Sequence, residues 1–259
     1  MRILITNDDG IEAEGLQVLV EFARTLGEVF VCAPKTQQSG TSQAVVFTRP
    51  VEILPATLPY APDIPAYRVD STPADCVRIA YFHLDWKPDL VFSGINRGLN
   101  MGEDIGYSGT NGAIFEAAYE GVPAIAFSTV PHSFEWAGKN IARVWDFVRE
   151  KKLFDFGRLF NVNIPEDPAP EILITRQGGP YYKDSYHHIG NGLYEAHGYS
   201  VHHNGGNLEL DTDATLSGFI TVTPLTTVRT DWKAYDLLRG LNDAAADGKA
   251  RNDGFGTRY

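Results

Sequence analysis

The sequence predicts a doubly wound α/β fold, in which helices cover both faces of a mostly parallel sheet. Two observations lead to this prediction. Through the first two-thirds of the chain, short apolar runs alternate with longer segments whose apolar residues recur at helical spacing. The short runs are apolar on both faces, as strands in the interior of a parallel sheet are. Strands joined in this way by helical crossovers give a Rossmann-like architecture.

Each element of the alternation follows from its own pattern. Residues 2–6 (RILIT) form the first strand, and residues 13–27 form a helix whose apolar face includes Leu16 and Leu19 and which ends at Gly27. The later elements, in chain order, are a strand at 28–34, a helix at 73–84, a strand at 89–94, a helix at 108–121, a strand at 122–128, a helix at 133–152 and a strand at 158–165. The basic end of the helix at 133–152 suits the negative end of its dipole.

Two regions depart from the alternation. Residues 44–54 and 66–71 form extended strands inserted between the core units. After residue 171 the chain becomes rich in Gly and Tyr, with β-like stretches at 192–203 and 218–225. The last residues, 244–259, are weakly structured, either a mobile tail or an arm that reaches a neighbouring subunit. We therefore expect one domain with a β-rich appendage.

Composition excludes several classes of protein. The 259 residues include 22 basic and 33 acidic side chains, for a net charge of −11, and no basic stripe for a nucleic acid polymer. The two cysteines, Cys32 and Cys76, are expected to be reduced and buried, as is typical of the cytoplasm. No apolar stretch approaches the ~20 residues of a membrane helix. We expect a cytoplasmic protein without a membrane partner.

Polar residues follow three of the expected strands at the point where each strand ends. Because loops after parallel strands with right-handed crossovers emerge along one edge of the sheet, these residues converge on one crevice. They are Asp8 and Asp9 after the first strand, Ser39 and Gly40 after the second, Asn96, Arg97 and Asn100 after the strand at 89–94, and Ser108, Gly109, Thr110 and Asn111 at the start of the next helix.

The residue types in this crevice suit a divalent cation. Two carboxylates (Asp8, Asp9), a hydroxyl (Ser39) and an amide oxygen (Asn96) are hard ligands, which favour Mg²⁺ or Mn²⁺ over zinc. One such ion per subunit lowers the pKa of a bound water and binds a phosphate oxygen. We therefore expect the two adjacent aspartates to bind a divalent cation.

The helix beginning at residue 108 adds a place for an anion. Its first free N–H groups and the positive end of its dipole face the same edge, with the hydroxyls of Ser108 and Thr110 as further donors. A metal ion beside an anion seat indicates phosphate ester chemistry, in which positioning and charge neutralisation supply most of the acceleration.

Several segments, in order along the chain, together resemble the SurE (stationary-phase survival protein) family. They are ILITNDDG (3–10), QSGTS (38–42), STPADCV (71–77), DLVFSGINRGLNMGEDIGYSGTNGA (89–113), GVPAIAFS (121–128), TRQG (175–178) and TDATLSGFITVTPL (212–225). The resemblance implies a metal-dependent nucleotidase acting on nucleoside 5′- and 3′-monophosphates, and some members also cleave short-chain polyphosphate.

The resemblance also implies an organisation for the chain. A single domain over residues 1–259 would have a Rossmann-like core at about 1–175. A β-hairpin and a C-terminal arm at about 176–259 would make a homodimer or homotetramer.

The resemblance carries residue roles as well. The metal ligands fall on Asp8, Asp9, Ser39 and Asn96, and the two aspartates are also the catalytic residues. Phosphate or substrate contacts fall on Asn7, Gly40, Asn96, Ser108, Gly109 and Thr110. This chain departs from its relatives at Gln37 and Gln38, where many carry basic residues, and at Asn111, where a small apolar residue is common.

The leading hypothesis is a phosphomonoesterase whose nucleophile is metal-bound water, oriented by Asp8 or Asp9. One alternative is an aspartyl-phosphate phosphatase, although those enzymes space their acids D-x-D and here the acids are adjacent. Another is a non-catalytic nucleotide-binding regulatory module. The first turn lacks G-x-G-x-x-G, which disfavours a dinucleotide cofactor.

Other polar and aromatic residues are assigned structural roles. The STPADC segment is expected to cap a helix with Pro73 in its first turn. The histidines at 187, 188, 202 and 203 are expected to face solvent or an interface. The tyrosines at 181, 182, 186, 194 and 199 are expected to pack in a hairpin or interface instead of binding a base.

Overall fold

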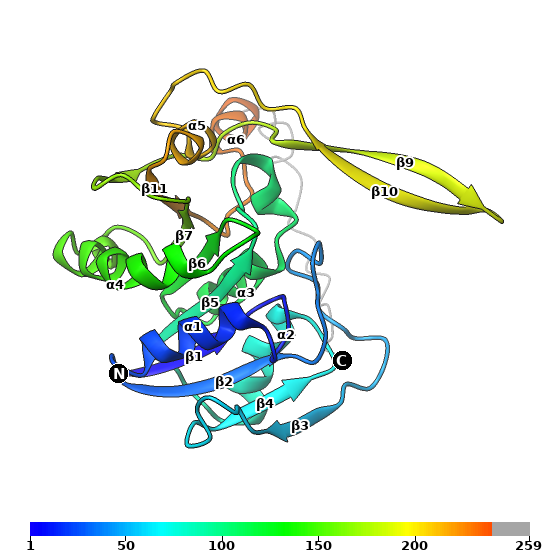
Figure 1. The fold of residues 1–259 in the computed structure, drawn as a ribbon, viewed down its shortest axis with the longest axis vertical. Helices are drawn as coiled ribbons and strands as arrows, with labels where there is room; N and C mark the ends of the chain where they lie inside the picture. The colour runs from blue at the N-terminus through cyan, green and yellow to red at the C-terminus, as the bar shows by residue number, and fades with distance from the viewer. Residues whose placement is uncertain (240–259) are drawn as a thin grey trace, which may run out of the picture. The chain divides into compact units, whose positions relative to one another are not determined.

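A computed structural model describes residues 1–239 and divides the chain into two compact units, Met1–Thr227 and Val228–Tyr259. The first unit holds a nine-stranded sheet of order β3-β4-β2-β1-β5-β6-β7-β11-β8 and a separate two-stranded sheet (Figure 1). In the second unit the described part contains one helix, α6 (Trp232–Leu238). The tail expected at 244–259 lies outside the described residues.

The centre of the large sheet is parallel, which confirms the predicted fold class. In the register of β1, Ile5 lies opposite Val31 of β2 on one side and Phe92 of β5 on the other. All three side chains are fully buried. The parallel strands are β1 (Arg2–Thr6), β2 (Glu28–Pro34), β4 (Ala66–Val69), β5 (Leu90–Arg97), β6 (Ala124–Thr129) and β7 (Leu159–Ile164).

Three strands extend this sheet at its edges. At one edge, β3 (Ile53–Ala56) pairs antiparallel with β4. At the other, β11 (Ile220–Leu225) pairs antiparallel with β7 and parallel with β8 (Ile172–Ile174). The stretch after residue 175 therefore supplies a strand to the main sheet as well as the hairpin.

The extended strand expected at 44–54 is a strand only from Ile53 onward. Upstream of it, backbone groups bond to side chains: the Val46 amide donates to the Asp75 carboxylate, and the Ala44 carbonyl accepts from Thr72. Those bonds take the place of a sheet ladder.

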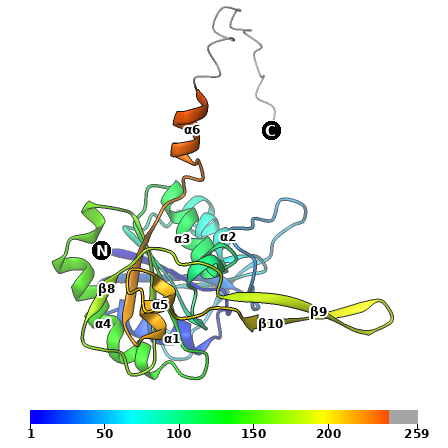
Figure 2. The ribbon, with the colours of Figure 1, turned by 90° about the horizontal axis from the view of Figure 1, so that it is seen from above.

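Helices cover both faces of the sheet, as Figure 2 shows. Alternation along β1 sends Ile3 and Ile5 to one face, where they share a core with α1 (Glu14–Ala23) and α4 (Glu135–Glu150). Leu4 points to the opposite face and joins a core with the second helix pair. That pair is α2 (Pro73–Arg78), which continues as a π-helical turn over Ile79–His83, and α3 (Gly109–Tyr119).

The appendage is a β-hairpin that projects from the core (Figure 1). Its strands are β9 (Tyr182–Gly190) and β10 (Leu193–Ser200), joined through Asn191 and Gly192, which both have positive φ. Asn-Gly favours the turns whose twist matches paired strands. Most hairpin side chains are exposed.

Both cysteines are free and buried, as expected. Among residues 1–239, no helix combines the length and the apolar character needed to cross a membrane.

Candidate metal and phosphate site

A cavity of about 750 Å³ opens where β1, β2 and β5 end. This is the edge at which the sequence places the site, because loops after parallel strands share it. Five of the predicted site residues line the cavity: Asp8, Ser39, Gly40, Asn96 and Ser108. Segments as distant as residues 8 and 108 therefore meet in one place.

Asn7 shapes the turn that carries the two acids. Its side chain is fully buried, with Nδ2 donating to the Gly10 carbonyl at 2.8 Å and Oδ1 accepting from the Gly10 amide at 3.2 Å. Gly10 has φ +102°, a left-handed value that glycine adopts without strain. Both polar atoms of Asn7 are thus occupied within the turn, and its contact with substrate stays a prediction.

Asp8 is a buried carboxylate held by one residue. Its side chain accepts a 2.6 Å bond from the Thr110 hydroxyl on Oδ1 and a 3.1 Å bond from the Thr110 amide on Oδ2. Burial, helped by the charge of Asp9, raises the pKa of Asp8 to about 6 in spite of the opposing hydrogen bonds from Thr110. A bound cation favours the ionised form, so the electrostatics here suit a metal ligand.

Asp9 links the loop after β2 to the end of β5. One oxygen accepts from the Arg97 backbone amide at 3.1 Å, and the other from Gln37 Nε2 at 3.4 Å. Gln37 Nε2 also donates to Ser39 Oγ at 3.1 Å. The neutral amide of Gln37 therefore bridges two of the predicted metal ligands.

The last two residues of β5, Asn96 and Arg97, supply a neutral oxygen donor and a guanidinium that is bound by other protein groups. Asn96 Nδ2 donates to the Gly98 carbonyl at 2.7 Å, which fixes the amide plane and leaves Oδ1 as an acceptor. The guanidinium of Arg97 is held by Glu14 and by the Pro131 carbonyl, each at 3.0 Å. Arg97 lines the cavity, but its guanidinium already binds these two protein groups.

The start of α3 offers fewer free donors than its sequence indicates. The Thr110 amide is taken by Asp8, and the Asn111 amide is taken by Ser108 Oγ, the N-cap, at 3.1 Å. A Cβ at Gly109 would lie 2.9 Å from Asp8 Cβ, so only glycine allows this close approach. The donors that remain for the predicted anion site are the Gly109 amide and the Ser108 hydroxyl.

Asn111 does not reach the cavity. Its side chain is fully buried, and neither polar atom has a hydrogen-bond partner among the described residues. The helix-start bond that the sequence suggested is made by its backbone amide. The cost of burying the Asn111 side-chain amide is therefore not offset by any hydrogen bond among the described residues.

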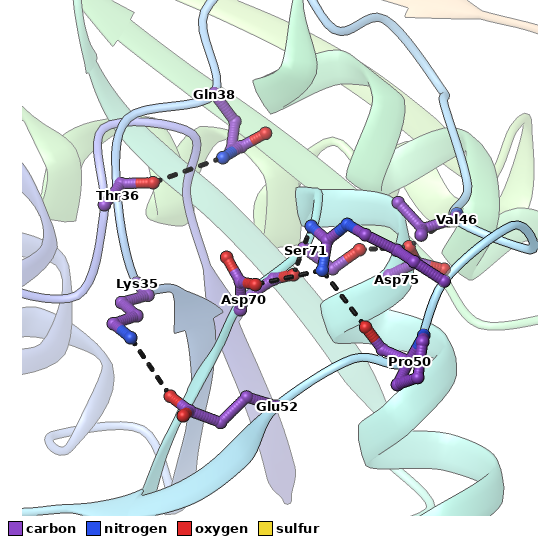
Figure 3. Close-up of polar contacts among 10 residues, drawn as sticks. Lys35, Thr36, Gln38, Val46, Pro50, Glu52, Asp70, Ser71 and Asp75 are labelled. Carbon is purple, nitrogen blue, oxygen red and sulfur yellow. Dashed lines mark hydrogen bonds and ion pairs between the residues drawn. The ribbon is translucent and has the colours of Figure 1, made fainter.

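A polar clamp fixes the loop between Ser39 and β3 (Figure 3). The Asp75 carboxylate accepts from the Val46 amide at 2.9 Å and from Ser71 Oγ at 2.5 Å. Thr72 caps α2 as predicted, and its hydroxyl also donates to the Ala44 carbonyl at 2.6 Å. The STPADC segment thus holds the Ser39 loop as well as starting a helix.

Of the residues on the outer wall of the cavity, the sequence indicates only Glu103 and Asp104, as a pair that either supports the metal ligands or faces solvent. The residues of this wall are Leu99, Glu103, Asp104 and Tyr107 before α3, and Pro180, Tyr182, Lys183, Asp184 and Gly198 at the base of the hairpin. Their convergence depends on tertiary contacts over seventy residues apart in the chain, and no local pattern signals it.

Histidines take no part in the site. Among the described residues no group of three or more His, Cys, Asp or Glu side chains is placed to hold a metal ion. His202, expected to face solvent or an interface, is largely buried and pairs with Asp213 at 2.8 Å. A site at Asp8 and Asp9 would draw on neutral oxygen donors for its remaining ligands.

Fold and site together define a class: a doubly wound α/β protein with adjacent acids after its first strand and a polar cavity at the carboxyl ends of its strands. The chain belongs to the SurE family. The family described as "Survival protein SurE" matches residues 3–184.

Individual relatives agree over most of the chain. The chain is 36% identical to "5'-nucleotidase SurE 1" of Thermus thermophilus, over 95% of this chain and 100% of that protein. It is 45% identical to "5'-nucleotidase SurE" of Myxococcus xanthus, over 70% of this chain and 69% of that protein. The crystal structure of the SurE protein from Aquifex aeolicus superposes with a TM-score of 0.73 at 35% identity, covering 94% of this chain and 100% of that one.

Proposed function

We propose that this protein is a metal-dependent phosphomonoesterase that hydrolyses nucleoside 5′- and 3′-monophosphates to nucleoside and phosphate. The observation that carries the proposal is that Asp8, Ser39 and Asn96 line one cavity beside the start of α3, while Gln37 links the neighbouring Asp9 to Ser39. Relatives named 5'-nucleotidase support the same reaction class.

The residues fit one Mg²⁺ or Mn²⁺ ion. Asp8 and Asp9 supply two charges, and Ser39 and Asn96 supply neutral hard oxygens. Asp8 is buried, and its raised pKa shows that the hydrogen bonds from Thr110 compensate its charge only in part. When bound, the ion supplies a Lewis acid for a phosphoryl oxygen and for the attacking water.

The chain's own groups would orient the substrate. The Ser108 hydroxyl and the Gly109 amide, at the positive end of α3, would take phosphoryl oxygens. Gly40, which lines the cavity and has open space at its Cβ position, would allow the ester close to the Ser39 loop. Thr110 would act by holding Asp8 instead of touching substrate.

Attack by water is favoured over phosphorylation of Asp8. Asp8 is 3% exposed and both its oxygens accept bonds from Thr110, so it is poorly placed to attack phosphorus. Hydrolysis in ¹⁸O-labelled water, with mass spectrometry of the quenched protein, separates the two. A trapped adduct on Asp8 or Asp9 would replace the water mechanism with the covalent one.

The direct test of function is phosphate release from 5′-AMP and 3′-AMP with Mg²⁺, Mn²⁺ or excess EDTA. We expect turnover only with a divalent ion. Nucleotide binding without metal-dependent turnover would favour the non-catalytic module. Short-chain polyphosphate is a second candidate substrate, to be run in the same assay.

Assembly and location complete the proposal. We place the protein in the cytoplasm, on the free state of Cys32 and Cys76. We also propose a homodimer or homotetramer, since the hairpin exposes many large side chains, among them Tyr186, Ile189 and Leu193. Light scattering after size-exclusion chromatography measures the oligomeric state directly.

A further inference from the structure

We infer that Tyr107 and Tyr182 form a nucleoside-binding subsite, in which the base of the hairpin selects the organic part of the substrate. The inference rests on the proposed phosphatase function. It assigns Tyr182 a role other than the hairpin packing expected from the sequence. Both tyrosines line the same cavity as Asp8, Ser39 and Asn96.

The outer wall of the cavity is firmly attached to the core. The Asp211 carboxylate, fully buried, accepts from the Gly102 amide at 3.0 Å and from the Gly178 amide at 2.8 Å. Gln177 Nε2 donates to the Gly102 carbonyl at 2.9 Å, and the Glu103 amide donates to the Gly179 carbonyl at 3.2 Å. These bonds join the 3₁₀ turn Gly102–Gly106 to the chain entering β9, so Tyr107 and Tyr182 are held on one wall.

Both rings have a large exposed surface where they line the cavity. Tyr107 is 68% exposed and Tyr182 is 49% exposed. Tyr182 and Tyr181 form a T-shaped pair, with ring centroids 4.6 Å apart, and such a contact leaves at least one face of Tyr182 for another partner. A nucleobase stacked on an aromatic ring gains roughly 1–3 kcal/mol, and every base has such a face.

Charge on the same wall selects the kind of occupant. Glu103, Asp104 and Asp184 line it against a single unpaired cation among the described residues there, Lys183. Burial, followed by the charges of Asp184 and Glu103, raises the pKa of Asp104, so these acids repel one another. A second phosphate would meet the same repulsion, whereas a neutral nucleoside would not. The wall therefore suits a nucleoside monophosphate better than a polyphosphate chain.

The size of the cavity agrees with this occupant. Small-molecule sites usually enclose ~300–1,000 Å³, and this cavity measures about 750 Å³. With phosphate at Asp8 and Ser39, the remaining volume lies toward Tyr107 and the hairpin base.

The test compares a substrate that has a base with one that lacks it. Phosphate release from 5′-AMP and from ribose 5-phosphate is measured for the wild type and for Tyr182→Leu, Tyr182→Phe and Tyr107→Leu. We expect the leucine variants to lower the ratio of the two kcat/KM values about tenfold, mainly through KM for AMP. Tyr182→Phe keeps the ratio. Tyr119→Leu, at the last residue of α3, which is 58% exposed and lies outside the cavity, is the matched control.

Adenosine binding, measured by calorimetry, provides a readout that needs no turnover. We expect Tyr182→Leu to weaken adenosine binding about tenfold and Tyr119→Leu to leave it unchanged. Equal losses on both substrates, or an unchanged ratio together with unchanged adenosine binding, would overturn the subsite. If the wild type hydrolyses neither ester yet adenosine binding still depends on Tyr182, the phosphatase proposal fails and the subsite stands.

Discussion

Thr110 holds Asp8 through two hydrogen bonds, one from its hydroxyl at 2.6 Å and one from its backbone amide at 3.1 Å. The two residues lie at the end of β1 and in the first turn of α3, so the bonds tie the acid-bearing loop to the helix. Both oxygens of a buried carboxylate are thereby oriented. Thr110, expected from the sequence to contact phosphate, uses both its hydroxyl and its amide to position the candidate metal ligand.

Removing the Thr110 hydroxyl tests this positioning role. A hydrogen bond to a charged group contributes roughly 1.5–3 kcal/mol, so Thr110→Val should lower kcat/KM for AMP by at least about tenfold. Thr110→Ser retains the donor and should keep most of the activity. Equal activity of the two variants would show that the hydroxyl is dispensable.

Substitution of either acid tests the metal site itself. Asp8→Asn and Asp9→Asn each remove one of the two negative charges, and we expect both to abolish turnover while leaving the far-UV circular dichroism spectrum unchanged. Binding of Mn²⁺, followed by electron paramagnetic resonance, should weaken in parallel. Variants that retain most of the wild-type rate would refute the site.

The raised pKa of Asp8 predicts a pH-dependent cost in the metal-free protein. The pKa rises from 3.8 to about 6, so between these values the folded state binds a proton that the unfolded state has released. Stability therefore falls as pH increases through this window, by about 3 kcal/mol once pH exceeds the folded value.

Asp8→Asn removes that cost, because an amide keeps both contacts with Thr110. In EDTA, we expect the variant to be more stable than the wild type at pH 8 and similar to it at pH 4, measured by urea unfolding. Asp9→Asn, at a more exposed acid, is the control and should change stability less. If the Asp8→Asn variant is less stable than the wild type at pH 8, the prediction is contradicted.

The unpartnered side chain of Asn111 predicts a stabilising substitution. Its two polar atoms are buried without hydrogen bonds among the described residues, which costs roughly 1–3 kcal/mol. Asn111→Val should raise the free energy of unfolding and leave AMP hydrolysis unchanged. Asn100→Val is the contrasting control, because Asn100 Nδ2 donates to Ser128 at 2.9 Å and its loss should destabilise. Lost activity in Asn111→Val would mean that the amide serves the reaction.

The Asp75 clamp predicts a link between a structural carboxylate and substrate affinity. Asp75→Ala frees the Val46 amide and Ser71, which loosens the loop that carries Ser39 and Gly40. We expect a loss of roughly 2–3 kcal/mol in stability and a higher KM for AMP. Asp70→Ala breaks only an exposed ion pair with Arg49 and should cost less than about 1 kcal/mol. If the two variants behave alike, the clamp does not position the loop.

Much of the fold was predictable because its signals are local. An apolar run such as RILIT has little choice but a buried strand, and helical spacing around Leu16 and Leu19 requires a helix on a core. The carboxyl ends of parallel strands share one edge of a sheet, so the sequence alone predicts that Asp8, Ser39 and Asn96 lie close together. The cavity holds all three.

Other features were decided by packing between distant segments. The sequence shows Thr110 as a free donor, Asn111 as a polar helix-start residue and Tyr182 as a hairpin residue. The structure directs Thr110 to Asp8, buries Asn111 and places Tyr182 on the cavity wall. The pairing of β11 with β7 is likewise a contact between segments far apart in the chain. Local pattern sets which element a residue joins and which face is apolar, whereas the partner of each polar group depends on which surfaces finally meet, and only tertiary packing determines that.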